Sequence, residues 1–313
     1  MTDSSEPGPE SHPHPASVEE VLADFAEAAK QATEAVNKKA GRDMVAATAV
    51  GVGLLAVAGA CLFWFPWGFA AFVALIVVGA QVEFGRVLNQ IRGTRIAVVP
   101  LGVGTVVLAL GTYGLHQYAL VPPGLFMVAT VGLTALVILG VRLLQPLPGY
   151  VLDVASSLFL LLYTALTLAF ILILVSPQGA LKVVAVVLGV TGSDTGGMLG
   201  VLFRKRHPFA QRISPKKSWE GVGGSYTVAS IAVVLVTVFA LQAPWWKGLI
   251  LALVVVTSAI VGDLVESVIK RDLGIKDMGT VLPGHGGIMD RFDSYMFAAV
   301  PAWLALVALF PHG

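Results

Sequence analysis

The sequence predicts an all-α protein that crosses a membrane about nine times, and three observations support this fold class. Of the 313 residues, 56% are hydrophobic and only 12% are charged, whereas an average soluble domain carries about 25% charged residues. Nine apolar segments of about span length follow one another from residue 44, and the basic residues gather in alternate connections between them. Lipid must cover such a chain, and segments in lipid are expected to be helical because they pair their own backbone groups.

Two segments precede the apolar region. Residues 1–17 are rich in Pro, Ser, Glu and His and are expected to form a disordered tail. Ser17 and Glu20 have the spacing of a helix capping box. Apolar residues, among them Val18, Val21 and Phe25, then recur at helical intervals. This pattern predicts an amphipathic helix over residues 18–42 that lies on the membrane or on the body of the protein.

The apolar segments divide into an N-terminal group of membrane helices, residues 43–175, and a C-terminal group with charged loops, residues 176–313. A span requires about 20 apolar residues, with about 17 as the lower limit, and the second and eighth segments are close to that limit. The alternation typical of a membrane β-barrel is absent. The predicted segments are 44–63, 66–82, 96–115, 122–141, 151–175, 179–203, 222–242, 245–263 and 293–311.

The distribution of basic residues predicts the orientation. Of the 20 Lys and Arg residues, only Lys182 and Lys247 lie near the connections that follow odd-numbered segments. The others lie in the N-terminal tail or in the loops after even-numbered segments. Because Lys and Arg gather on the cytoplasmic side, we expect the N-terminus and the charged loops in the cytoplasm and the C-terminus outside.

Carboxylates mark the two regions with the most charge. Asp194 lies inside an apolar segment, where an ionised carboxylate is costly, and Asp263 ends another apolar segment. Asp290 and Asp293 are three residues apart and share one helix face as the last segment begins. Carboxylates gathered at one depth repel each other unless a cation lies between them, and oxygen ligands favour a hard ion such as Mg²⁺. The sequence therefore predicts a magnesium site.

The residues after Asp263 fit a helix that continues into the charged region. On a continuous helix Asp263, Ser267 and Lys270 share one face. Glu266 and Lys270 have the i,i+4 spacing of a helix salt bridge. We therefore expect Asp263 to lie on the same helix face as the ammonium group of Lys270.

Basic residues and glycines alternate with these carboxylates. Cations can hold phosphate oxygens, and glycines allow close backbone approach. The combination indicates metal-dependent phosphoryl or nucleotidyl transfer at the inner membrane surface. The net charge of +1 provides no general attraction for nucleic acid, and the single cysteine, Cys61, excludes a Cys-based metal cluster. The basic residues are Arg212, Lys216, Lys217, Lys270, Arg271, Lys276 and Arg291.

One run of 27 residues, 267–293, resembles the diagnostic motif of phosphatidate cytidylyltransferases. In that family the motif reads S, two residues, K-R, four residues, K-D, small and apolar positions, P-G-H-G-G, two residues, D-R, one residue and D. Residues 193–196 and 212–221 resemble two further blocks of the family. The positions that fill the motif are Ser267, Lys270, Arg271, Lys276, Asp277, Pro283, Gly284, His285, Gly286, Gly287, Asp290, Arg291 and Asp293.

The resemblance implies an enzyme of the cell membrane that makes CDP-diacylglycerol and pyrophosphate from CTP and phosphatidic acid, with its site facing the cytoplasm. It also implies Mg²⁺, with a second cation left open, and a homodimer. The implied catalytic residues are Lys270, Arg271, Asp277, His285, Asp290 and Arg291. The implied substrate-binding residues are Ser214, Lys216, Lys217, Lys276, Gly286 and Gly287. The implied metal ligands are Asp263 and Asp290, with Asp194 and Asp293 as further candidates.

Three other functions compete with this hypothesis. A CTP-dependent lipid or polyprenol kinase resembles the family in its membrane core, but the complete 267–293 motif argues against it. A CDP-alcohol phosphotransferase would carry an Asp-Gly-x-x-Ala-Arg block, which is absent. A secondary transporter would also place carboxylates in the membrane, but such proteins usually show repeated halves, and this chain shows no such repeat.

Overall fold

Every regular element of the described part of the chain is a helix, as the sequence predicts. The computed structural model describes residues 44–202, 207–214, 217–279, 281 and 286–311. Eight of its helices are long and apolar enough to cross a membrane. A ninth apolar helix, α2 (Met44–Trp64), precedes them. The predicted tail and amphipathic helix, residues 1–42, lie outside the described residues.

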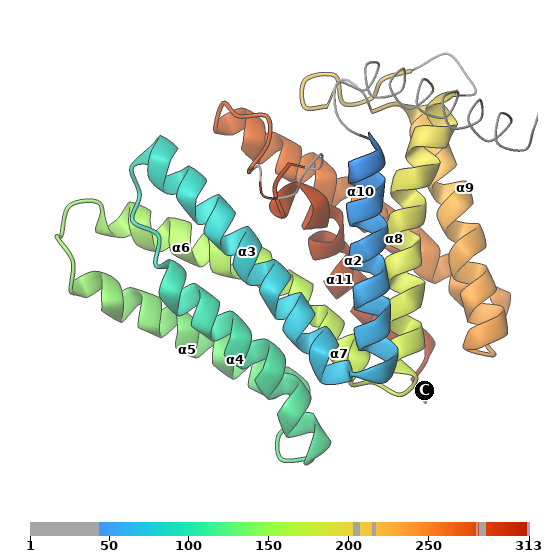
Figure 1. Cartoon of the computed structure of the whole chain (residues 1–313), viewed down its shortest axis with the longest axis horizontal. Helices are drawn as coiled ribbons and strands as arrows, with labels where there is room; N and C mark the ends of the chain where they lie inside the picture. The colour runs from blue at the N-terminus through green and yellow to red at the C-terminus, as the bar shows by residue number, and fades with distance from the viewer. Residues whose placement is uncertain (1–43, 203–206, 215–216, 280, 282–285, 312–313) are drawn as a thin grey trace, which may run out of the picture.

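Each predicted apolar segment corresponds to a helical rod (Figure 1). The fifth rod contains a short 3₁₀ turn, η1, and the seventh ends in a π-helical turn, η2. After α2 the elements are α3 (Pro66–Arg92), α4 (Val98–Gln117), α5 (Pro123–Leu143), α6 (Tyr150–Ala165), η1 (Leu166–Leu168), α7 (Ala169–Leu174), α8 (Gly179–Leu202), α9 (Trp219–Leu235), η2 (Val236–Ala240), α10 (Trp245–Asp272) and α11 (Met289–Leu309).

Two helices extend well beyond their apolar segments. The segment 66–82 continues as helix to Arg92, and the segment 245–263 continues to Asp272. Hydropathy detects contact with lipid, whereas helix formation depends on backbone pairing and packing, so the polar ends of these rods were outside the predicted spans. The extensions matter because they carry Glu83 on α3, and Glu266 and Lys270 on α10.

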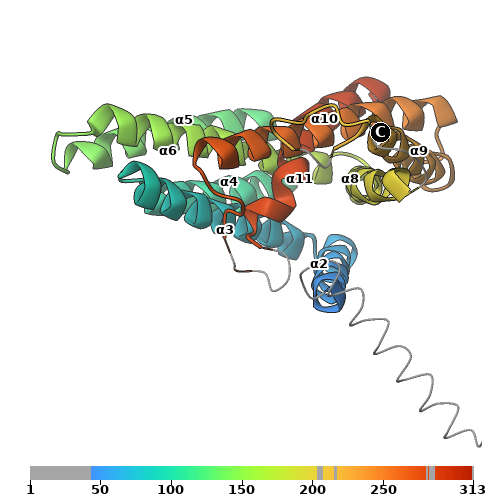
Figure 2. The ribbon, with the colours of Figure 1, turned by 90° about the horizontal axis from the view of Figure 1, so that it is seen from above.

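The helices form two groups that are joined by α11. Helices α3, α4, α5 and α6 pack together on one side, and α8, α9 and α10 pack together on the other (Figures 1 and 2). Helix α11 contacts α10 and α8 as well as α3, α6 and α7. Helix α2 packs mainly against α3 at the edge of the bundle. The start of α11 therefore lies where residues of both groups can meet.

Glycines bring α8 and α9 into unusually close contact. Gly192, Gly196 and Gly200 recur every four residues along one face of α8. A Cβ atom on Gly196 would overlap the carbonyl group of Gly224 on α9, and one on Gly200 would overlap the carbonyl group of Glu220. Small residues of this spacing let helix backbones approach closely in membranes, where van der Waals contact supports association. This crossing packs the turn of α8 that carries Asp194 against Ser225 of α9, whose hydroxyl donates to the carbonyl oxygen of Ser193 at 2.6 Å.

Candidate functional site

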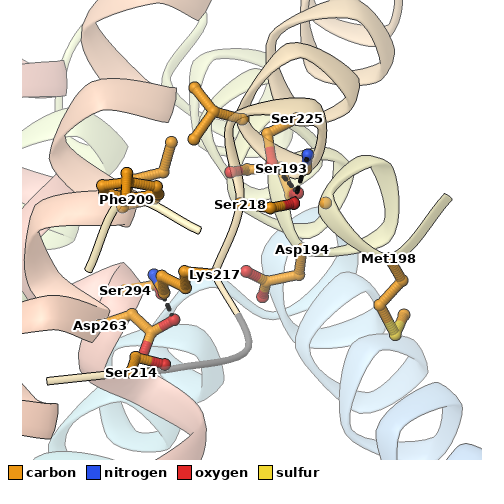
Figure 3. Close-up of a pocket in the computed structure, with 15 residues that line it drawn as sticks. Ser193, Asp194, Met198, Phe209, Ser214, Lys217, Ser218, Ser225, Asp263 and Ser294 are labelled. Carbon is orange, nitrogen blue, oxygen red and sulfur yellow. Dashed lines mark hydrogen bonds and ion pairs between the residues drawn. The ribbon is translucent and has the colours of Figure 1, made fainter. Parts of the chain in front are cut away.

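A polar cavity of about 430 Å³ opens between α8, α9 and α10, with the start of α11 at its edge. Asp194 of α8 points into it, opposite Lys217 and Asp263 (Figure 3). Hydroxyl groups and the aromatic ring of Phe209 complete much of the wall. The polar lining residues are Ser193, Asp194, Ser214, Lys217, Ser218, Ser225, Asp263 and Ser294.

The segment before α9 folds back on itself and carries Lys217 to the cavity. Pro208 and Ser218 form an isolated antiparallel bridge, and the amide of Phe209 donates to the carbonyl oxygen of Lys217 at 3.3 Å. Ser218 then caps α9, because its hydroxyl oxygen accepts from the amide of Gly221 at 3.3 Å. The rings of Phe209 and Trp219 pack with centroids 5.2 Å apart. Lys217 is therefore held directly before Ser218, the residue that caps the helix.

Lys217 forms an ion pair with Asp263 at the cavity wall. The Nζ atom of Lys217 lies 2.6 Å from an Oδ atom of Asp263, and the side chain of Asp263 remains 40% exposed. The other Oδ atom lies 3.4 Å from the hydroxyl of Ser267, as expected for residues on one face of a helix. Asp194 lies within electrostatic range of both partners. The cavity thus presents two carboxylates and a cation to anything that enters it.

A second, more buried charge cluster joins α10 to α11. Lys270 contacts Glu266 one turn earlier, which confirms the predicted i,i+4 pair. Its Nζ atom also lies 2.9 Å from an Oδ atom of Asp290. The side chains of Glu266 and Asp290 are only 1% and 5% exposed, so this cation neutralises two carboxylates that water hardly reaches.

Asp290 also holds the loop that leads into α11. Its second oxygen accepts from the backbone amides of Met278 at 2.8 Å and Gly287 at 2.9 Å. Gly286 has a φ of +89°, which glycine adopts without strain. One side chain therefore fixes both ends of the 278–287 segment against Lys270.

Glu83 of α3 supports the same loop from the opposite group of helices. Its Oε2 atom accepts from the amide of Met289 at 3.1 Å, although the two residues are 206 positions apart. Gly279 and Gly287 lie so close to its carboxylate that a Cβ atom on either would overlap it. Glu83 is 5% exposed, and its Oε1 atom has no hydrogen-bond partner among the described residues. The sequence interpretation missed Glu83, although a carboxylate at the end of an apolar segment is a recognised signal of function.

The four predicted metal ligands do not gather at one point. Asp194 and Asp263 line the cavity, whereas Asp290 is held by Lys270 and two amides. Asp293 is buried at the start of α11, where it accepts from the amide of Ser294 and lies within electrostatic range of Asp194, Asp263 and Glu266. Among the described residues, no three Asp, Glu, His or Cys side chains are close enough to hold a metal ion by themselves. A shared cluster of four carboxylates is therefore not formed.

Two carboxylates are still enough to hold Mg²⁺ beside a phosphate substrate. Mg²⁺ commonly binds through one or two carboxylates, substrate phosphate oxygens and water. Asp194 and Asp263 face the same cavity from different helices and provide this donor set. The residues present therefore fit the ion, and direct ligation by any of the four carboxylates remains a prediction.

The remaining predicted residues occupy different places. Ser214 lines the cavity, and the Nε atom of Arg271 lies 3.5 Å from the carbonyl oxygen of Ile213 in the segment before α9. Lys276 and Asp277 are exposed in the loop after α10. Arg291 lies on the first turn of α11, within electrostatic range of Asp194. Lys216 and His285 lie outside the described residues.

Comparisons with known proteins agree with this arrangement. The model of the "Cytidylyltransferase family" matches residues 45–309. A phosphatidate cytidylyltransferase of Mycobacterium bovis is 39% identical over 298 residues, which cover 91% of this chain and 95% of the relative. One of Mycobacterium leprae is 36% identical over 289 residues, which cover 87% of this chain and 90% of the relative. One of Synechocystis is 45% identical over 105 residues, 32% of this chain and 34% of the relative. The match spans every described helix that lines the site, and the chain belongs to the cytidylyltransferase family.

Proposed function

We propose that this protein transfers the cytidylyl group of CTP to phosphatidic acid and releases CDP-diacylglycerol and pyrophosphate. The observation that carries this proposal is the cavity in which Asp194, Asp263 and Lys217 meet at the end of apolar helices. Relatives that match about nine-tenths of the chain are named phosphatidate cytidylyltransferase. Both the site and the family therefore support transfer between a nucleotide and a membrane lipid.

The reaction places modest demands on proton transfer. An oxygen of the lipid phosphate monoester attacks the α-phosphorus of CTP, and the bond from that phosphorus to the β-phosphate oxygen breaks. The attacking phosphate is already ionised near neutral pH, so no strong general base is required. The protein must instead bring two anions together and align them. Lys217 at the cavity wall supplies positive charge for this task, and Arg291 lies within electrostatic range of Asp194.

Mg²⁺ is the cofactor that we propose for this site. Asp194 and Asp263 would hold it, and Lys217 would exchange its present contact with Asp263 for substrate phosphate. The bound ion would neutralise charge on the phosphate oxygens of CTP and of the departing pyrophosphate. Ligation by Asp290 or Asp293, and a second cation, belong to the same proposal.

The charge distribution supports a location and orientation. We propose that the protein resides in the cell membrane with its N-terminus and the cavity on the cytoplasmic side, because 18 of its 20 basic residues lie on that side of the predicted topology. CTP would then reach the cavity from the cytoplasm, and the lipid from the inner leaflet. The homodimer implied by the family resemblance also belongs to this proposal.

The position of a radioactive label in CTP tests the proposed reaction. Purified protein would be incubated with phosphatidic acid, Mg²⁺ and CTP labelled at either the α- or the γ-phosphate. We expect lipid-soluble label from α-labelled CTP alone, together with one pyrophosphate released per lipid product. Lipid that carries the γ-label would instead reveal a kinase, and absence of labelled lipid in both reactions would contradict the proposal.

A further inference from the structure

A second cavity, an apolar groove of about 280 Å³, lies beside the polar one between α2, α3, η1, α7, α8 and α11. One wall is a stripe along α2 formed by Gly51, Leu54, Leu55 and Ala58. The facing stripe on α3 is formed by Phe69, Phe72, Val73 and Ile76. Both stripes have the spacing i, i+3, i+4, i+7, so each is one continuous helix face. The stripe on α2 extends for about 10 Å along the helix axis.

One end of this groove is polar and meets the cavity described above. Asp194 lines both cavities, and Arg291 lines the groove beside it. The hydroxyl groups of Thr191 and Tyr295, which also line the groove, lie 2.8 Å apart. The groove is therefore apolar along most of its length and ends at Arg291 and Asp194. Asp194 also faces the cavity that contains Lys217 and Asp263.

The position of α2 leaves this groove close to the lipid. Helix α2 packs mainly against α3 and sits at the edge of the bundle (Figure 2). Its other faces are exposed, with Val52 61% and Val57 52% accessible. Because α2 is apolar along its length, we expect hydrocarbon rather than water around these residues. A lipid chain could thus reach the groove sideways past α2.

We propose that the groove holds an acyl chain of the acceptor lipid, with the lipid's phosphate monoester at the polar end next to Arg291 and Asp194. This inference rests on the proposed function and adds the place where the lipid substrate binds. The charge of Arg291 matches an anionic headgroup, and the apolar stripes match hydrocarbon. The shared residue Asp194 places the phosphate where it can meet a nucleotide in the polar cavity.

A bulky residue inside the groove tests the proposal by kinetics. Ala58→Trp would fill part of the groove, whereas Ala56→Trp places the same side chain on an exposed face of α2. We expect Ala58→Trp to raise the KM for long-chain phosphatidic acid about 10-fold, the equivalent of about two methylene groups kept out of the groove. The KM for CTP should stay unchanged, and Ala56→Trp should behave like the wild type. Equal KM values for the lipid in all three proteins would overturn the inference.

A binding measurement keeps the inference testable if Ala58→Trp does not fold. Cys61 is the only cysteine, so Leu54→Cys in a Cys61→Ser protein provides a single thiol in the groove. We expect phosphatidic acid to slow its reaction with an apolar maleimide at least 5-fold, and phosphatidylcholine or CTP to leave the rate unchanged. Leu75→Cys on the lipid-facing side of α3, 71% exposed, should not distinguish the two lipids.

The two experiments separate failure of the groove from failure of the proposed reaction. Equal protection of the Leu54→Cys thiol by both lipids would show an unspecific lipid surface and contradict the inference, even in a protein that makes CDP-lipid. No protection by any lipid would mean that another part of the chain or a second copy fills the groove, and would contradict it as well. Specific protection in a protein without cytidylyl transfer would support the groove and refute the reaction.

Discussion

Two ion pairs in this molecule have similar geometry and different surroundings. Arg142 and Asp153 join α5 to α6 with 2.6 Å between charged atoms, and their side chains are 2% and 3% exposed. Lys217 and Asp263 are also 2.6 Å apart, but they line a cavity and are 19% and 40% exposed. The first pair is closed to ligands, whereas the second can exchange partners with one.

The surroundings of Arg142 and Asp153 explain their structural role. Arg142 also donates to the carbonyl oxygens of Pro146 at 2.8 Å and Pro148 at 3.2 Å. Asp153 accepts from the amide of Arg95 at 2.8 Å. A buried charge is tolerated when hydrogen bonds satisfy it in this way. The pair therefore fixes the loop between two helices and leaves no open position for substrate.

The largest effect that we expect comes from the Lys270 cluster, where a buried ion pair also organises a loop. Asp290→Asn removes the charge that faces Lys270 and disturbs the two amide contacts of the other oxygen. Turnover should fall to background, more than about 1,000-fold, since the loop and its cation act together. Folded protein should remain, as gel filtration in detergent would show. Near-normal turnover would remove Asp290 from the site.

Breaking the buried ion pair between Arg142 and Asp153 should lower stability and leave catalysis intact. Arg142→Met leaves Asp153 buried with less compensation, and loss of one partner of a buried pair typically costs about 3–5 kcal/mol. A thermal unfolding assay in detergent should show a lower midpoint, with normal turnover per folded molecule. A variant that is fully stable but inactive would contradict the structural role of this pair.

Breaking the ion pair between Lys217 and Asp263 should lower turnover and leave stability nearly unchanged. Asp263→Asn should lower turnover about 100-fold, comparable with the removal of one charge-stabilising group at an active site, and should change the unfolding midpoint little. Asp272→Asn is the matched control, because Asp272 lies on the same helix and pairs with Arg92 where both side chains are at least 46% exposed. That control should keep its activity. Equal losses of turnover in both variants would contradict a specific role of Asp263 and of the cavity in catalysis.

A smaller effect on kcat should show whether Glu83 positions the loop or is needed for its charge. Glu83→Ala removes the acceptor for the amide of Met289 and opens space beside Gly279 and Gly287. We expect kcat to fall about 10-fold with little change in the KM for CTP, because the loop shifts while the cavity remains. Glu83→Gln keeps an acceptor oxygen and should recover most of the rate. If Glu83→Gln were as impaired as Glu83→Ala, the charge itself would be needed and the positioning role would be wrong.

The sequence predicted the fold well because a segment in lipid must pair its own backbone groups and therefore forms a helix. Each apolar segment forms a helical rod, and two residues of the 267–293 motif, Lys270 and Asp290, lie in contact. The i,i+4 pair of Glu266 and Lys270 was also predictable, since it depends only on helix geometry. Local spacing and hydropathy therefore contain most of the information about the rods.

Contacts between distant helices were not predictable from these patterns. Asp263 and Asp290 were predicted to be metal ligands, with Asp194 and Asp293 as further candidates, but the structure places Asp263 in a cavity with Asp194 and pairs Asp290 with Lys270. Glu83 reaches Met289 across 206 positions, and no periodicity indicates such a pair. The glycines of α8 could signal close helix contact, yet only the structure identifies α9 as their partner. Packing between rods decides which charges meet, and it is encoded over the whole chain.

The most direct test of the account asks whether Asp194 and Asp263 hold a divalent ion together with the nucleotide. Mn²⁺ suits the same oxygen ligands as Mg²⁺, and its binding to purified protein with CTP can be followed by electron paramagnetic resonance without any turnover. We predict tight binding to the wild type and to Asp272→Asn, and at least 10-fold weaker binding to Asp194→Asn and to Asp263→Asn. Equal Mn²⁺ affinity in all four proteins would contradict the account.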